Sequence, residues 1–299
     1  MARSHRRSNS RPRPPHGSAG LTPPTRPVKT LERVISKAGL GSRTEARQWI
    51  HAGRVTVNGA LVRNPDHWID FARDRVGFDG RPLEARERMY VLLYKPTGYI
   101  TTYQDPQGRP TVYDLVKDVG TFLATVGRLD LDTSGLLLMT NDTQFAERVT
   151  NPDSHVPKTY LVKSSIVLSD EQLQRLRDGI ELEDGPTRPA LVTRLRDSAK
   201  YTHLEITLTE GRNRQVRRMI EALDAHVLKL VRVKIGPVAI GTLPIGQWRT
   251  LTPREIAELG GARAGATPAP RSARSLRATR VRASGDGGQR PAAHRGRRH

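Results

Sequence analysis

The chain has 299 residues, a formal net charge of +20 and no cysteine. Its length is sufficient for two domains with their own cores. The lack of cysteine excludes disulfides, thiol nucleophiles and cysteine-based metal sites. The nine histidines show no metal-ligand spacing, so we expect no metal. No apolar run reaches the roughly 20 residues that span a bilayer, so we expect no membrane partner and a cytoplasmic location.

The positive charge is concentrated at the two ends of the chain. Residues 1–29 carry seven Lys and Arg and no acid, residues 261–299 carry ten Arg and one Asp, and residues 30–260 carry the remaining +4. Both ends have few large apolar residues, so we expect two disordered basic tails. Such tails would attract a polyanion, although a solvated tail without a specific role has the same composition.

The first predicted domain covers residues 30–85. Leu31, Val34, Ile35 and Ala38 have helical spacing, and Gly39 marks the end of that helix. Residues 42–45 predict a capping box that opens a second helix, which should bury Ala46, Trp49 and Ile50 and end at Gly53. Residues 54–57 and 60–62 predict a hairpin around Asn58-Gly59, and a polar hairpin-like stretch surrounds Asp79-Gly80.

The second predicted domain covers residues 86–260 and begins with a strand at residues 89–94. Further strands are expected at 159–167, 191–195 and 203–208, and helices at 170–177 and 214–223. Two small helices with a hairpin, followed by a strand-rich mixed region, predict the α+β class.

The first domain carries basic side chains that helical periodicity places mostly away from the buried face: Arg33, Lys37, Arg43, Arg47 and Arg54. They can form one RNA-binding surface, or they can be an ordinary solvated face. By themselves the residues leave both interpretations open.

The segment VGRLDLDTSGLLLMTND, residues 126–142, is the most informative in the chain. Its Asp-x-Asp-x-Ser-Gly start imitates a calcium-binding loop, but Asn141 stands where the bidentate Glu would be needed, so this interpretation fails. A buried turn with acidic caps is the remaining structural interpretation. It does not explain an Arg-Leu-Asp sequence placed directly before an apolar strand.

Two families are indicated by these strings. Residues 31–65, with AGLGSRTEARQWIHAGRVTVNGALV at their centre, resemble the S-four-like RNA-binding domain, which binds structured RNA through phosphate and shape. The segment GRLDLDTSGLLLMTND resembles the catalytic motif of RsuA/RluB-type ribosomal pseudouridine synthases. Three more motifs follow that family's order: YKPTGYITT at 94–102, KTYLVK at 158–163 and EGRNRQVRRM at 210–219.

The resemblance implies an isomerase that detaches a uracil from its ribose, turns it and rejoins it through carbon 5, with no cofactor. Asp130 would be the catalytic carboxylate, acting through a covalent adduct or through a glycal intermediate. That carboxylate is expected to be buried, and Arg217 would keep it ionised. Arg212, Arg214 and Arg218 are the competing candidates. Tyr160 would stack on the uracil and assist proton removal.

The base must leave the RNA stack before the reaction. The resemblance implies that Arg128 enters the gap it leaves. Lys95 and Pro96 would shape the site wall, with Lys95 on phosphate, and Arg212 and Arg214 are further candidate RNA contacts. Tyr94 stands where the family often has Asn, so a polar role at that position is not expected. Asp132, Thr133 and Ser134 are expected to build the turn.

The expected partner is ribosomal RNA or a ribosome assembly intermediate, bound by a monomer. GRPTVYDLV at 108–116 and GQWRTLTPREIAEL at 246–259 resemble the large-subunit branch of the family. The rival hypothesis is a non-catalytic assembly factor with a decayed synthase fold. Asp130, Tyr160 and Arg217 are all present, which favours the enzyme.

Overall fold

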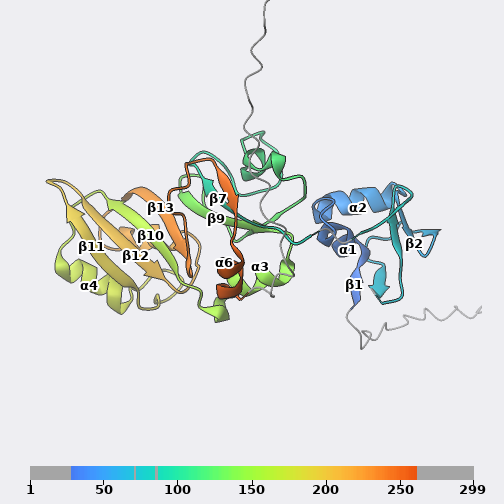
Figure 1. The fold of residues 1–299 in the computed structure, drawn as a ribbon. Coiled ribbons are helices and arrows are strands. Elements are labelled where there is room, and N and C mark those ends of the chain that lie inside the picture. The colour runs from blue at the N-terminus through green and yellow to red at the C-terminus, as the bar shows by residue number, and fades with distance from the viewer. Residues whose placement is uncertain (1–27, 71, 85–86, 261–299) are drawn as a thin grey trace, which may run out of the picture. The chain divides into compact units, whose positions relative to one another are not determined.

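The structure is a computed structural model that describes residues 28–70, 72–84 and 87–260. Residues 28–84 form a small unit of helices and short strands, and residues 87–260 form a larger unit around a nine-stranded sheet (Figure 1). The expected disorder of the tails concerns residues outside the described ranges. The boundary of the N-terminal tail is corrected, because Val28 and Lys29 already belong to the first strand.

The small unit contains β1 (Val28–Thr30), α1 (Leu31–Lys37), α2 (Arg43–His51), β2 (Val55–Val57), β3 (Ala60–Leu61), β4 (Trp68–Asp70), β5 (Val76–Phe78) and β6 (Arg81–Pro82). The predicted capping box is present: the Ser42 hydroxyl accepts from the Glu45 amide, and the Glu45 carboxylate accepts from the Ser42 amide at 2.8 Å. Asn58 and Gly59 both have positive φ, which lets β2 turn directly into β3.

The core of the small unit is formed by the apolar faces of α1 and α2 against β2 and β4. Its buried members include Leu31, Ile35, Ala46, Ile50 and Ile69. The expected burial of Trp49 is only partial. Its ring packs at the edge of this core, tilted against Phe78 with 5.1 Å between the ring centroids.

The larger unit contains β7 (Tyr90–Lys95), the 3₁₀ turns η1 (Val112–Leu115) and η2 (Lys117–Val119), β8 (Ala124–Val126), β9 (Ser134–Thr140), α3 (Thr143–Thr150), η3 (Pro152–Ser154), β10 (Lys158–Ser164), α4 (Asp170–Asp178), β11 (Leu191–Asp197), β12 (Thr202–Leu208), α5 (Gln215–Glu221), β13 (Val227–Ile235), β14 (Val238–Ala239), β15 (Trp248–Thr250) and α6 (Pro253–Glu258). The α+β class expected from the sequence is confirmed. The strand expected at 159–167 is shorter, because it ends at Ser164.

The sheet has the order β11-β12-β10-β13-β9-β7-β15, and its neighbours are antiparallel except at one place. There β13 runs parallel to β9 for only two residue pairs, Val231 with Ser134 and Arg232 with Gly135. This short contact, which we call the seam, joins two halves of the sheet. Gly135 has φ of 120°, and a Cβ there would collide with the backbone of Arg232, so only glycine permits the strands to meet.

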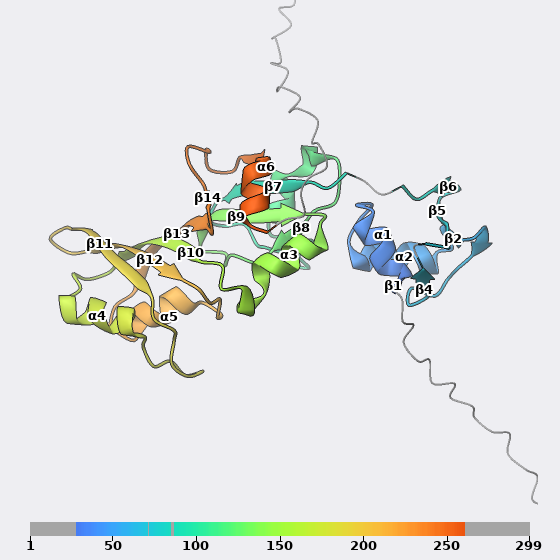
Figure 2. The same ribbon diagram turned by 60° about the horizontal axis from the view of Figure 1, so that its bottom comes forward.

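Helices cover the two halves differently. In Figure 2, α4 and α5 lie on the same side of the half made by β10, β11 and β12, where their apolar faces contact Leu204 and Ile206. Around β7 and β9, one face packs against α3 and α6 through residues such as Phe145 and Ile256. The other face packs against the segment 112–123. No helix in the described ranges is long and apolar enough to cross a membrane.

Candidate active site

Residues 127–133, which we call the Asp130 loop, connect β8 to β9 and emerge at the seam of the sheet. Gly127 opens the loop with φ of 77°. Arg128 is exposed, and the Asp130 side chain is 40% exposed. The carboxylate therefore lies at the protein surface, where it is open to solvent. The expectation of a buried carboxylate is corrected to a half-exposed one.

Lys95, at the end of β7, supports the backbone of the Asp130 loop from the protein interior. Its side chain is fully buried, and its ammonium donates hydrogen bonds to the backbone carbonyls of Asp130 at 2.9 Å, Thr133 at 2.8 Å and Pro96 at 3.0 Å. Burial lowers the pKa of Lys95 to about 8, while the charges of Asp130 and Asp132 act in the opposite direction. With its ammonium enclosed in this way, Lys95 is not placed to contact RNA phosphate, contrary to the expectation from the sequence.

Arg217 braces the same loop from α5, although it does not bond Asp130. Its guanidinium is buried, and Nη2 lies 3.0 Å from Oδ2 of Asp132 and 3.1 Å from the Asp132 carbonyl oxygen. Its Nη1 donates to the Val227 carbonyl at 3.3 Å. The expected direct pairing of Arg217 with Asp130 is thus corrected. Arg217 lies in the first turn of α5, and its side chain reaches Asp132 in the Asp130 loop instead of Asp130.

Arg214 is the cation nearest to the Asp130 carboxylate, with Nη1 3.9 Å from Oδ2 of Asp130 and 3.7 Å from Oδ1 of Asp132. It precedes α5 in a left-handed conformation, with φ of 47°. A non-glycine residue rarely adopts this conformation, and such residues are concentrated at functional sites. The Arg214 side chain is 44% exposed and remains available to a bound anion as well as to the two carboxylates.

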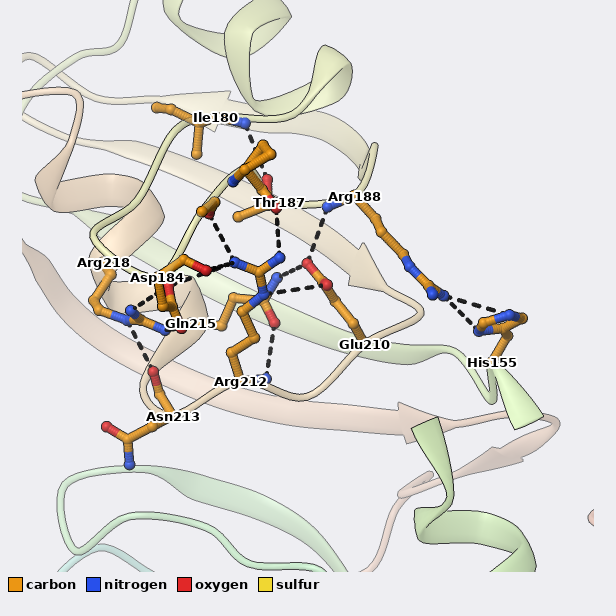
Figure 3. Close-up of polar contacts among 12 residues, drawn as sticks. His155, Ile180, Asp184, Thr187, Arg188, Glu210, Arg212, Asn213, Gln215 and Arg218 are labelled. Atoms are coloured by element: carbon orange, nitrogen blue, oxygen red, sulfur yellow. Dashed lines mark hydrogen bonds and ion pairs between the residues drawn. The ribbon is translucent and has the colours of Figure 1, made fainter. Parts of the chain in front are cut away.

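Arg212 joins two backbone segments, as Figure 3 shows. Its guanidinium donates to the carbonyls of Gly185, at 2.7 Å, and of Pro186, and so holds the turn at 183–187 against the segment 210–214. Only a quarter of the side chain is exposed. The expected RNA contact of Arg212 is not supported by this placement. The side chain is committed to the turn at 183–187.

Arg218 and Glu210 complete this clamp. The Arg218 guanidinium forms a two-pronged ion pair with Asp184, at 2.8 and 3.1 Å, and its Nε donates to the Asn213 carbonyl at 2.9 Å (Figure 3). The Glu210 carboxylate accepts from the Arg188 amide and from the Gln215 side chain. Arg218 pairs with Asp184, away from the Asp130 loop, so it does not compete for the Asp130 carboxylate. Asp184 was missed because nothing in its local sequence indicates a partner 34 residues away.

Tyr160 lies on β10, one strand from the seam. Its backbone pairs with Ile206 on one side and with Arg232 on the other. The ring packs partly against the core under β10 and β12. This combination of a held ring and partial exposure suits a stacking platform. One strand, β13, separates Tyr160 from the strand that follows the Asp130 loop, so the role of Tyr160 stays a prediction.

Three of the basic residues expected to bind RNA in the small unit are already ion-paired. Glu32 is buried and accepts from Arg43 at 2.8 Å and Arg47 at 2.5 Å. Burial alone would raise the pKa of Glu32, but the two guanidinium groups outweigh it and lower that pKa. Arg54 pairs with Asp79 and lies 4.7 Å from the centroid of the Phe78 ring. These pairs hold the guanidinium groups in fixed positions.

The other two basic residues of the small unit lie on α1. Arg33 is exposed and Lys37 is half-buried. Burial and the neighbouring charge of Lys29 lower the pKa of Lys37 to about 8. Arg33, Arg43 and Arg47 keep exposed guanidinium area, so the small unit presents positive charge from both helices. Within residues 28–70, 72–84 and 87–260, no group of three or more His, Asp or Glu side chains is arranged to hold a metal ion.

Comparison with known proteins identifies two families in this chain. The RNA pseudouridylate synthase family matches residues 89–222, and the S4 domain family matches residues 30–70. A protein of Bacillus subtilis (strain 168) named ribosomal large subunit pseudouridine synthase B is 41% identical over 78% of this chain and 96% of its own length. Its namesake of Escherichia coli (strain K12) is 35% identical over 84% of this chain and 91% of its own.

A solved structure agrees as well. The crystal structure of a pseudouridylate synthase superposes with a TM-score of 0.56 at 34% sequence identity and covers 77% of this chain and 99% of that one. The S4 match lies within the first predicted domain, residues 30–85, and the synthase match lies within the second, residues 86–260. The chain belongs to the RNA pseudouridylate synthase family and carries an S4 domain before its synthase domain.

Proposed function

We propose that this protein converts one uridine of large-subunit ribosomal RNA into pseudouridine, with Asp130 as the essential carboxylate. The observation that carries the proposal is the Asp130 loop: it presents a half-exposed carboxylate, while two buried cations, Lys95 and Arg217, hold the backbone carbonyls of Asp130 and Asp132. The choice of the large subunit is supported by relatives that bear that name. A cytoplasmic monomer acting on RNA or on an assembly intermediate completes the proposal.

The reaction is an isomerisation and needs no external reagent. The bond between C1′ and N1 breaks, the uracil turns, and C1′ bonds to C5, which then loses its proton while N1 gains one. Asp130 acts on the sugar, either by forming an ester at C1′ or by taking the C2′ proton to give a glycal. Both routes use the Asp130 carboxylate, and the Arg214 guanidinium lies 3.9 Å from it.

Tyr160 and Arg128 serve the flipped nucleotide. Unstacking a base costs a few kcal/mol, and the Tyr160 ring offsets part of that cost by stacking on the uracil. The Tyr160 hydroxyl then receives or relays the C5 proton. Arg128 is exposed two residues before Asp130, so its guanidinium can fill the gap in the RNA stack while the carboxylate faces the extruded nucleotide.

The S4 domain would bind RNA through its phosphates. Arg33, Arg43 and Arg47 present positive charge on α1 and α2, and Glu32 fixes the directions of the last two. Rigid guanidinium groups lose less side-chain entropy when they bind than free ones do. The 17 Lys and Arg of residues 1–29 and 261–299 add attraction that depends on salt rather than on sequence.

The test uses large-subunit ribosomal RNA labelled with tritium at C5 of uracil. We expect the protein to release tritium in proportion to pseudouridine formed, and not to release it from small-subunit RNA. Release from small-subunit RNA alone would reassign the substrate. No release from either RNA or from ribosome assembly intermediates would contradict the proposed function and favour a non-catalytic assembly factor.

A dependence on pH follows from Lys95. Its ammonium serves three carbonyls, whereas the neutral amine has only two hydrogens to donate, so deprotonation loosens the Asp130 loop. We expect the single-turnover rate to fall above a pH near 8, where Lys95 has its lowered pKa. Because that pKa lies below the 10.5 of the unfolded chain, this group adds stability as pH rises between the two values. If the rate and the folding stability both fall above that pH, deprotonation of Lys95 is not the cause of the pH dependence.

A further inference from the structure

The seam leaves two positions of β9 without a backbone neighbour on its β13 and β8 side. Strand β13 pairs with Ser134 and Gly135, and strand β8 pairs with Leu138, Met139 and Thr140. Leu136 and Leu137 lie between these two contacts. The Asp130 loop leaves β8 and returns to β9 across the same gap, so whatever fills the gap contacts both ends of the loop.

The side chain of Arg232 fills this gap. It comes from β13, next to Gly135, and is only 5% exposed. Its Nε donates to the Leu136 carbonyl at 2.8 Å, and its Nη1 approaches the Arg128 carbonyl at 3.5 Å. These two acceptors lie on either side of the Asp130 carboxylate in the chain. One planar guanidinium therefore ties the beginning of the loop to the strand that follows it.

The burial of Arg232 lowers the stability of the fold. Its Nη2 is enclosed and has no hydrogen-bond partner within the described residues, as is true of Nε of Arg217. An unsatisfied buried donor costs about 1–3 kcal/mol, and an apolar side chain would avoid that cost. Violations of this kind are expected where function requires a particular group. Arg232 is therefore better explained by what it holds than by stability alone.

Arg232 also completes a pattern made by two other cations. Lys95 holds the carbonyls of Asp130 and Thr133, and Arg217 holds the carbonyl of Asp132. Arg232 adds the carbonyls of Arg128 and Leu136. Five carbonyls of the segment 128–136 thus face buried positive charge, and only Arg232 reaches the two outer ones. Its backbone also pairs with Tyr160.

We infer that Arg232 is a positioning residue of the synthase: it sets the direction of Arg128 and the placement of Asp130 relative to Tyr160, without touching the RNA. This inference rests on the proposed function. It predicts that a change at Arg232 slows the isomerisation of bound RNA and leaves the affinity for RNA nearly unchanged.

The experiment compares the full-length protein with Arg232→Lys and Arg232→Met. Lysine keeps the charge but has one nitrogen, which cannot reach both carbonyls as the guanidinium does. Arg249→Met is the matched control, because Arg249 is also a partly buried sheet arginine, paired with Glu255 at 2.6 Å away from the loop. The readouts are the single-turnover rate at saturating enzyme, the Kd for RNA, the Tm, and hydrogen exchange of peptides covering residues 127–136.

We expect Arg232→Lys to lower the single-turnover rate by about 100-fold with Kd within threefold, and Arg249→Met to leave both unchanged. Faster exchange should be confined to residues 127–136, where the amides of Leu129 and Thr133 are bonded within the site. If Arg232→Met does not fold, Arg232→Lys alone decides.

A wild-type rate in Arg232→Lys would overturn the inference. So would a Kd that rises as much as the rate falls, which would make Arg232 an RNA contact, or faster exchange over the whole sheet, which would make it a stability residue. If the wild-type protein releases no tritium, the proposed function fails separately. Exchange confined to residues 127–136 would then still support the positioning role, and unchanged exchange there would refute it.

Discussion

Replacement of Asp130 by Asn is expected to abolish tritium release, with a loss of at least about 1,000-fold in the single-turnover rate. The amide has nearly the same shape but cannot attack C1′ or accept the C2′ proton. The main-chain carbonyl of residue 130 still accepts from Lys95 in the variant, so the loop keeps its support. RNA affinity is expected to stay within about threefold, because most protein–RNA affinity comes from phosphate and shape contacts.

The control for this variant is Asp153→Asn, which removes the same charge from an exposed position in η3. It should retain wild-type release. The measurements are tritium release under single-turnover conditions and filter binding of the same RNA. Activity of Asp130→Asn equal to wild type would refute the assignment of the carboxylate. A loss of activity in both variants would point to net charge rather than to this side chain.

The second large effect is expected for Lys95→Met. The substitution removes the Lys95 donor from the carbonyls of Pro96, Asp130 and Thr133, of which only the Asp130 carbonyl keeps a recorded second donor, the Thr133 amide at 3.1 Å. Each unsatisfied group costs about 1–3 kcal/mol, and removing a buried charge offsets part of that cost, so we expect a net destabilisation of about 2–4 kcal/mol. Because the freed carbonyls belong to the Asp130 loop, the single-turnover rate should also fall by about 100-fold.

Urea unfolding and single-turnover kinetics measure the two effects. Lys117→Met is the control, since Lys117 is exposed and pairs with Asp114 at 2.9 Å on the surface. An exposed pair of this kind contributes about 0.5 kcal/mol. If Lys95→Met unfolds at the same urea concentration as the wild type, the buried hydrogen bonds are not the support described above. If it is destabilised but fully active, the loop does not depend on Lys95.

Local structure follows closely from local sequence in this chain. The capping box at Ser42 and Glu45, the Asn58-Gly59 turn and the strand beginning near Tyr90 depend on neighbours within a few residues, and all are present as predicted. The side chains of β12 also alternate between buried and partly buried along the strand, because its apolar side chains face one core. Patterns of this kind carry their physical cause within the segment itself.

Pairings between distant residues were the part that local patterns could not supply. The sequence motifs placed Arg217 with Asp130, but its guanidinium meets Asp132, and Arg214 lies nearer to Asp130. Lys95 and Arg212 were expected on RNA, whereas both bind backbone carbonyls. A cationic side chain gives the same sequence signal whether its acceptor is a phosphate or a carbonyl of its own chain.

The sequence by itself determined the family, the order of the two domains and the residue types of the site, because four motifs and their spacing can be recognised without the three-dimensional structure. Only the tertiary structure decided how the site is held. The seam between β9 and β13 brings Arg232 beside Gly135 across 97 residues of chain. The cations around the Asp130 loop are buried only because the two strands approach each other this closely. The free energy of that burial comes from contacts between distant segments, so no single segment of the sequence encodes it.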